Sequence, residues 1–100
     1  MELKLHVTYT AKSGCREQFV RKIVTAGILT EIRNEAGCLG YDYYFSAQDE
    51  NVVLLIERWE SEAHVRVHLT QPHMAQLRKI KEEYIETTRL MKVQEEPYAL

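Results

Sequence analysis

The segment LLIERWESEAHVRVHLTQPHM, residues 54–74, decides how the rest of the chain is arranged. It begins inside an apolar run that is typical of a strand, and it reaches a charged edge at Trp59, the only tryptophan. Ser61 then occupies the position of a helix N-cap, because its hydroxyl can accept a hydrogen bond from a backbone N–H of the first turn. Thr70-Gln71-Pro72 ends this helix and opens a second one, since proline is favoured in a first helical turn.

Three of the four histidines fall in this segment, and they are candidates for chemistry. His64 and His68 are separated by one helical turn, so they share one face of the predicted helix. His73 follows the proline at the start of the next helix. Because histidine titrates near neutral pH, the groups best suited to proton transfer are concentrated at one strand end and one helical hinge.

The composition predicts a globular protein and excludes some partners. The chain has 100 residues, of which 45% are hydrophobic and 28% charged, with a formal net charge of -2. This mixed charge argues against nucleic acid, because phosphate binding requires a basic surface. No apolar run approaches the roughly 20 residues of a membrane span. The first residues lack the pattern of a signal peptide, so we expect a cytoplasmic protein without a membrane partner.

Before the central segment, the pattern predicts two strands separated by a helix. Residues 3–10 alternate apolar and polar side chains, which is the period of a strand. Residues 15–34 carry one broad apolar face, and we expect a single helix that Ser13 caps and Gly37 ends. Residues 38–45 are rich in tyrosine, which favours a second strand.

The remaining elements complete a recognisable order. We expect a third strand over residues 52–60, helices over about 61–69 and 72–84, and a fourth strand over 86–93. The order is β-α-β-β-α-β, which predicts an α+β, ferredoxin-like fold in a single domain of residues 1–100, with 93–100 as a C-terminal tail. Both faces of the strands carry bulky side chains, so a homodimer joined sheet to sheet would cover the face without helices.

Two stretches resemble one family. GCLGYDYY at residues 37–44 and IERWESEAHVRVHLTQPHM at residues 56–74 resemble the antibiotic biosynthesis monooxygenase (ABM) domain family, and most of all its small quinol monooxygenases. The resemblance implies a dimeric α/β barrel with a pocket between the sheet and the helices. It also implies oxidation of a quinol or another small hydroxylated aromatic by molecular oxygen, without metal, flavin or haem. The protein must then supply a base and an apolar box that excludes water.

The resemblance also suggests roles for the histidines. His68 matches the family histidine before Leu69 and is the first candidate for the base, the alternative being a residue that packs at the helix end. His64 would assist or lie at the rim of the pocket, and the favoured alternative is a surface histidine without a role. His73 recurs in the family pattern and is either catalytic or structural at the hinge.

The aromatic residues are candidates for binding the substrate. Trp59 either walls a flat aromatic substrate or packs in the core, since tryptophan buries a large area in both cases. Tyr41, Tyr43 and Tyr44 cannot all face one way in a strand. Either Tyr41 and Tyr43 or Tyr44 therefore points to the pocket, and the other side faces the dimer partner.

We expect no metal and no cofactor. His64 and His68 have the spacing of zinc ligands on a helix. However, no acidic ligand follows in the usual register, and Pro72 redirects the chain before His73. The two cysteines, Cys15 and Cys38, do not form a metal motif.

Three other functions fit the same scaffold. The haem-degrading branch of the superfamily has an asparagine, a tryptophan and a histidine where this chain has Val7, His68 and Arg78, so that function is disfavoured. A relative that processes a phosphorylated quorum-sensing signal would need a basic residue for the phosphate, and Arg78 or Arg89 are the candidates. A non-catalytic, dimeric ligand-binding module is the remaining alternative.

Overall fold

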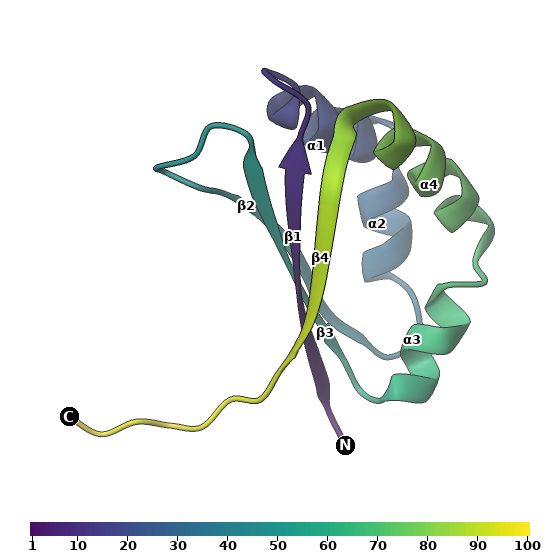
Figure 1. The fold of residues 1–100 in the computed structure, drawn as a ribbon. Coiled ribbons are helices and arrows are strands. Elements are labelled where there is room, and N and C mark those ends of the chain that lie inside the picture. The colour runs from purple at the N-terminus through teal and green to yellow at the C-terminus, as the bar shows by residue number, and fades with distance from the viewer.

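Figure 1 shows the computed structural model, which describes all residues from Met1 to Leu100. The elements are β1 (Leu3–Ala11), α1 (Arg16–Thr25), α2 (Ile28–Arg33), β2 (Cys38–Phe45), β3 (Val52–Trp59), α3 (Glu62–His68), α4 (Pro72–Tyr84) and β4 (Ile85–Val93). The four strands pair antiparallel in the order β2-β3-β1-β4. This order confirms the predicted ferredoxin-like α+β fold. No helix has the length and apolar character needed to cross a membrane.

The single helix predicted over residues 15–34 is wrong, because the chain forms two helices there. The break lies at Gly27, whose φ of 78° is a left-handed conformation that glycine adopts without a Cβ penalty. Cys15 stands at the N-cap of α1 without a side-chain hydrogen bond, so Ser13 does not cap this helix. Gly37 has a φ of 81° but follows the end of α2 by several residues, and it belongs to the turn into β2.

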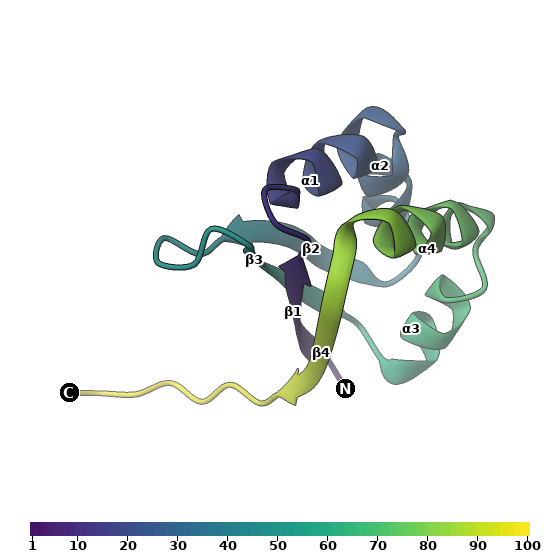
Figure 2. The same cartoon turned by 45° about the horizontal axis from the view of Figure 1, so that its top comes forward.

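The helices cover one face of the sheet, as Figures 1 and 2 show. On β1, Val7, Tyr9 and Ala11 are buried toward the helices, and the intervening residues face the other way. Tyr9 packs edge-on against Phe19 of α1, with ring centroids 5.3 Å apart. The core cluster consists of Val7, Tyr9, Phe19, Ile23, Ile28, Ile32, Tyr41, Val53, Leu55, Trp59, Met74, Leu77 and Ile80.

The opposite face of the sheet has no helix on it (Figure 2). Leu54 and Ile56 of β3 lie on this open face and are half-buried. His6 of β1 pairs with both Ile56 and Met91, so these side chains share the same face. After β4, the tail of residues 94–100 runs away from the body of the molecule, with Tyr98 exposed.

Replacing Gly37 with alanine is expected to lower the free energy of unfolding by about 2–3 kcal/mol. The left-handed backbone conformation alone costs about 1–2 kcal/mol for a residue with a Cβ, and the new Cβ would also overlap the His64 ring. Gly27→Ala is the matched control, because nothing lies within 4 Å of a Cβ built there. Urea unfolding measures both variants. Equal losses in the two would contradict the predicted contact with His64.

Candidate active site

Glu35, His68 and His73 meet between the helices, although they come from three separate elements. Glu35 follows α2, His68 ends α3, and His73 lies in the first turn of α4. The Glu35 carboxylate lies 2.9 Å and 3.0 Å from Nδ1 of His68 and 2.7 Å from Nε2 of His73. The three side chains are 9%, 3% and 14% exposed, respectively. One buried carboxylate therefore binds two imidazole rings.

These contacts fix which nitrogen of each ring carries a proton. A carboxylate can only accept hydrogen bonds, so Nδ1 of His68 and Nε2 of His73 must donate. The other nitrogen of a neutral imidazole then keeps its lone pair. In His68 that nitrogen is Nε2, which is left as a proton acceptor. The Glu35 contact thus selects the tautomer of His68 that can act as a base.

Aromatic rings surround His68. The Trp59 ring lies 4.6 Å from the His68 ring between centroids, and the Tyr41 ring lies 5.9 Å away. Trp59 is completely buried, and its indole N–H donates to a Glu57 carboxylate oxygen at 3.0 Å. Burial raises the pKa of the Tyr41 phenol well above its usual value, so this hydroxyl stays protonated at neutral pH. His68 therefore lies among aromatic rings, with the Glu35 carboxylate bound to its Nδ1.

His64 lies apart from this cluster. Ser61 caps α3 as predicted, since its hydroxyl accepts a hydrogen bond from the His64 N–H. The same hydroxyl lies 2.7 Å from Nδ1 of His64, whose side chain is 36% exposed and lies against Gly37. The local cap therefore holds His64 beside Gly37, where its Nε2 lies 3.7 Å from the Glu60 carboxylate, and it makes no hydrogen bond to Glu35.

The other predicted residues fall on both sides of the sheet. Tyr41 and Tyr43 lie on the face that the helices cover, 5.8 Å apart between ring centroids. Tyr44 pairs with Leu54 on the open face and is 51% exposed. Arg89 pairs with Thr8, so it also lies on the open face, on the opposite side of the sheet from Glu35, His68 and His73.

The sequence interpretation missed two acidic residues of the site. Glu57 alternates in step with Leu55 and Trp59, so its side chain points to the same buried face of β3. A charged residue at such a position could have been predicted from sequence as part of a site. Glu35 has no such local signal, because it meets His68 across 33 residues of sequence. No acidic residue near His68 or His73 in sequence contacts either ring. Their acidic partner is Glu35, in the turn after α2.

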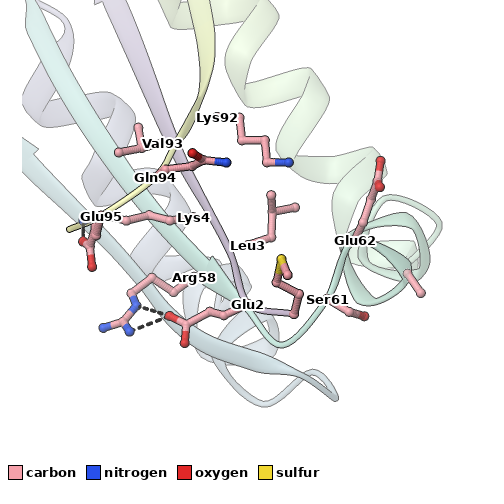
Figure 3. A pocket seen from close by; sticks show the side chains of 12 residues that line it. Glu2, Leu3, Lys4, Arg58, Ser61, Glu62, Lys92, Val93, Gln94 and Glu95 are labelled. Carbon is pink, nitrogen blue, oxygen red and sulfur yellow. Dashed lines mark hydrogen bonds and ion pairs between the residues drawn. The ribbon is translucent and has the colours of Figure 1, made fainter.

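Two hollows on the surface differ in character. One of about 540 Å³ lies beside the cluster and is lined by Ala26, Ile28, Glu31, Asn34, Glu35, Gln71, Pro72, His73 and Gln76. The other, about 750 Å³, lies where the N-terminus meets the end of β4 (Figure 3). Three cationic side chains line it, of which Lys4 and Arg58 are paired with Glu95 and Glu2, respectively, and the third is Lys92. Of these two hollows, only the first borders the cluster, through Glu35 and His73.

Replacing Glu57 with glutamine is expected to stabilise the protein more as the pH rises. Burial raises the pKa of the Glu57 carboxyl above its ordinary value of 4.5, and the Trp59 hydrogen bond only partly offsets this. The folded chain therefore holds this proton more tightly than the unfolded chain, and stability is lost as pH rises through the folded pKa. Glutamine keeps an oxygen that can accept the Trp59 hydrogen bond but cannot ionise.

Urea unfolding at about pH 4 and about pH 8 measures this effect, since the first value lies just below and the second well above the ordinary pKa of a glutamate. The gain from Glu57→Gln should be small at the lower pH and larger at the higher one. Glu96→Gln, in the exposed tail, is the matched control. A gain that is the same at both pH values would contradict the account of Glu57.

Comparison with known proteins gives a consistent result. The family model described as antibiotic biosynthesis monooxygenase matches residues 3–80. The relative named "Probable quinol monooxygenase YgiN", from Escherichia coli K12, is 35% identical over an alignment of 57 positions, and the match covers 49% of this chain and 55% of the relative. The chain thus spans about half the length of the curated relatives it matches.

Solved structures agree on the fold. PA3566 from Pseudomonas aeruginosa superposes with a TM-score of 0.83 at 25% identity, covering 96% of this chain and 95% of that one. Rv0793 from Mycobacterium tuberculosis gives a TM-score of 0.80 at 23% identity and covers 100% of both chains. The arrangement of helices on one face of the sheet is therefore shared over nearly the whole length.

Proposed function

The chain belongs to the antibiotic biosynthesis monooxygenase family, and on that premise we propose that it oxidises a small quinol or related hydroxylated aromatic with molecular oxygen. We propose that it needs no cofactor and that His68 is the base. The observation that carries the proposal is the buried His68 ring, which Glu35 fixes in one tautomer and Trp59 flanks. The similarity to the probable quinol monooxygenase supports the substrate class.

The base is needed because ground-state oxygen accepts electrons one at a time. Nε2 of His68 takes a proton from a substrate hydroxyl, and the resulting anion is a much better electron donor. Glu35 stabilises the imidazolium that forms, because its carboxylate already accepts the Nδ1 hydrogen. A positioned base of this kind contributes roughly 10²–10⁴-fold to the rate.

The reaction balances without an external reductant. The quinol loses its two hydroxyl hydrogens, and one oxygen atom is inserted into a ring C–H bond to give a hydroxyquinone. The second oxygen atom leaves as water. The quinol supplies all the electrons that reduce the oxygen molecule, so the protein's part is to deprotonate, orient and shield the substrate.

The remaining site residues have supporting roles in this proposal. Tyr41, Tyr43 and Trp59 form the apolar surroundings of His68, and His73 holds Glu35 in place. His64 and Tyr44 are outside this arrangement. The substrate enters from the hollow beside Glu35 and His73. Because His68 is 3% exposed, contact with it requires side chains at its edge to move, and bulk water is excluded.

Oxygen uptake tests the proposed function. The purified protein is supplied with a panel of benzoquinols and naphthoquinols, and dissolved oxygen is followed with an electrode. Uptake above the uncatalysed rate, proportional to the protein concentration, is expected for at least one quinol. If none consumes oxygen faster than the buffer control, the ligand-binding alternative becomes the better account.

We also propose a homodimer joined through the open sheet face. Leu54 and Ile56 are only half-buried there, Tyr44 is exposed, and Nε2 of His6 is buried without a hydrogen-bond partner. A second copy would cover this apolar surface. Sedimentation velocity should show a dimer that Ile56→Glu converts to a monomer, because the new carboxylate would be buried at the interface. A wild-type monomer at micromolar concentration would contradict the proposal.

A further inference from the structure

We propose that Glu35, His68 and His73 also bind one divalent transition-metal ion of the zinc type, and that this ion switches off the base. The ligand atoms of the three residues all lie within 4.8 Å of one another. Two imidazole nitrogens and one carboxylate are a ligand set that Zn²⁺ accepts, with a fourth position left open. The effect on the base rests on the proposed function, whereas metal binding does not.

The sequence argued against a metal, but that argument considered His64 with His68 and did not include Glu35. His64 and His68 share a helical face, but no acidic ligand follows them in register. In the structure His64 is turned toward Gly37, and His73 takes its place beside His68. Glu35 then supplies the acidic ligand from the segment after α2. The three residues thus complete a set that the sequence spacing conceals.

The distances from the Glu35 carboxylate to the two histidine nitrogens require only small movements. The two nitrogens lie within 4.8 Å of each other and must come to about 3.4 Å apart. Zinc bonds of 2.0–2.2 Å in a tetrahedral arrangement separate the ligand atoms by about 3.4 Å. The nitrogen–oxygen distances in the cluster are 2.9 Å for His68 and 2.7 Å for His73. Each must therefore lengthen by about 0.5–0.7 Å when an ion replaces the shared hydrogens. The neighbouring hollow, which Glu35 and His73 line, gives the ion a route from solvent.

The choice of metal follows from the donor atoms. Imidazole nitrogen suits Zn²⁺, Co²⁺, Ni²⁺ and Cu²⁺, whereas Mg²⁺ and Ca²⁺ need several oxygen ligands. The cluster offers only one carboxylate, and its other two ligands are imidazole nitrogens. The site therefore selects a borderline transition metal rather than a hard cation.

Metal binding would change the proton state of His68 without unfolding the chain. An ion on Nδ1 uses the lone pair of that nitrogen, so the ring proton must sit on Nε2 instead. The nitrogen that accepts the substrate proton then becomes a donor. No net proton is released by a neutral ring, because the hydrogen moves from one nitrogen to the other. The ion would therefore inhibit oxidation of the quinol reversibly.

Competition between the metal-free protein and a chromophoric zinc chelator tests the binding. One Zn²⁺ per chain is expected, and Co²⁺ in its place should give the visible absorption of a four-coordinate site. Glu35→Gln and His73→Gln should each weaken binding by at least about tenfold, since even changes around the ligands cost 10–100-fold. His64→Gln, outside the cluster, is the matched control and should bind as the wild type does.

The outcomes separate the two proposals. Three results would contradict the proposed zinc site. They are unchanged zinc binding in Glu35→Gln and His73→Gln, loss of zinc binding in His64→Gln, and no binding by the wild type at millimolar Zn²⁺. X-ray absorption of the wild-type zinc complex, which should show two imidazole ligands and one carboxylate, decides the matter if a variant fails to fold. Inhibition of oxygen uptake by Zn²⁺, reversed by a chelator, tests the switch. A lack of any quinol oxidation would remove the switch but leave the binding result intact.

Discussion

His68→Ala is expected to lower turnover on a quinol by roughly 10²-fold or more, the usual scale for loss of a general base. The variant keeps Glu35 and Trp59 but has no nitrogen to take the substrate proton. Because the loss concerns the chemical step, kcat should fall more than KM rises. Steady-state oxygen uptake on a quinol that the wild type oxidises measures both constants.

Two variants make this result specific. His64→Gln should keep wild-type turnover, because His64 is bound to Ser61 and lies outside the cluster. Glu35→Gln should reduce kcat less than His68→Ala does, since the glutamine amide can still orient the ring but cannot stabilise an imidazolium. Wild-type turnover in His68→Ala would show that the base has been assigned to the wrong residue.

Trp59→Phe is expected to lower the free energy of unfolding by about 2–4 kcal/mol, or roughly 10–20 °C in Tm. Trp59 is completely buried, so the smaller ring leaves a cavity beside His68. The variant also removes the indole N–H that donates a hydrogen bond to Glu57. A buried acceptor left without a partner lowers the free energy of unfolding by about 1–3 kcal/mol. Denaturant unfolding measures the loss, and Tyr98→Phe in the exposed tail is the control.

A second substitution separates the two causes. Glu57→Met combined with Trp59→Phe removes both partners of the hydrogen bond, so the double variant should be more stable than Trp59→Phe alone. If the double variant is instead less stable by the sum of the two single losses, the hydrogen bond to Glu57 contributes nothing measurable. The cavity would then account for the whole effect of Trp59→Phe.

The strands could be predicted from sequence because their side chains alternate. Val7 and Tyr9 share one parity on β1, whereas the face on which Tyr41 lies was left open by its own alternation and is given by its burial in the structure. The break at Gly27 could not be predicted in this way. Apolar residues continue at helical spacing on both sides of it, so the period alone does not reveal a left-handed turn.

The site was harder to predict than the fold, because its residues meet through tertiary structure. The spacing of His64 and His68 correctly indicates one helix but does not put them in one site. The capping bond to Ser61 fixes His64, and the end of α3 turns His68 toward Glu35. No local pattern links Glu35 to His68, whereas the proline before His73 did indicate the hinge that brings that ring to the cluster.

The most direct test of the central claim is the fate of labelled oxygen during quinol oxidation by chelator-treated wild-type protein. With ¹⁸O₂, the account predicts one labelled atom in the hydroxyquinone product, and one oxygen molecule consumed for each quinol oxidised. The chelator should not reduce the rate. A product without label, formed together with hydrogen peroxide, would contradict the account, because the protein would then be an oxidase that transfers no oxygen to its substrate.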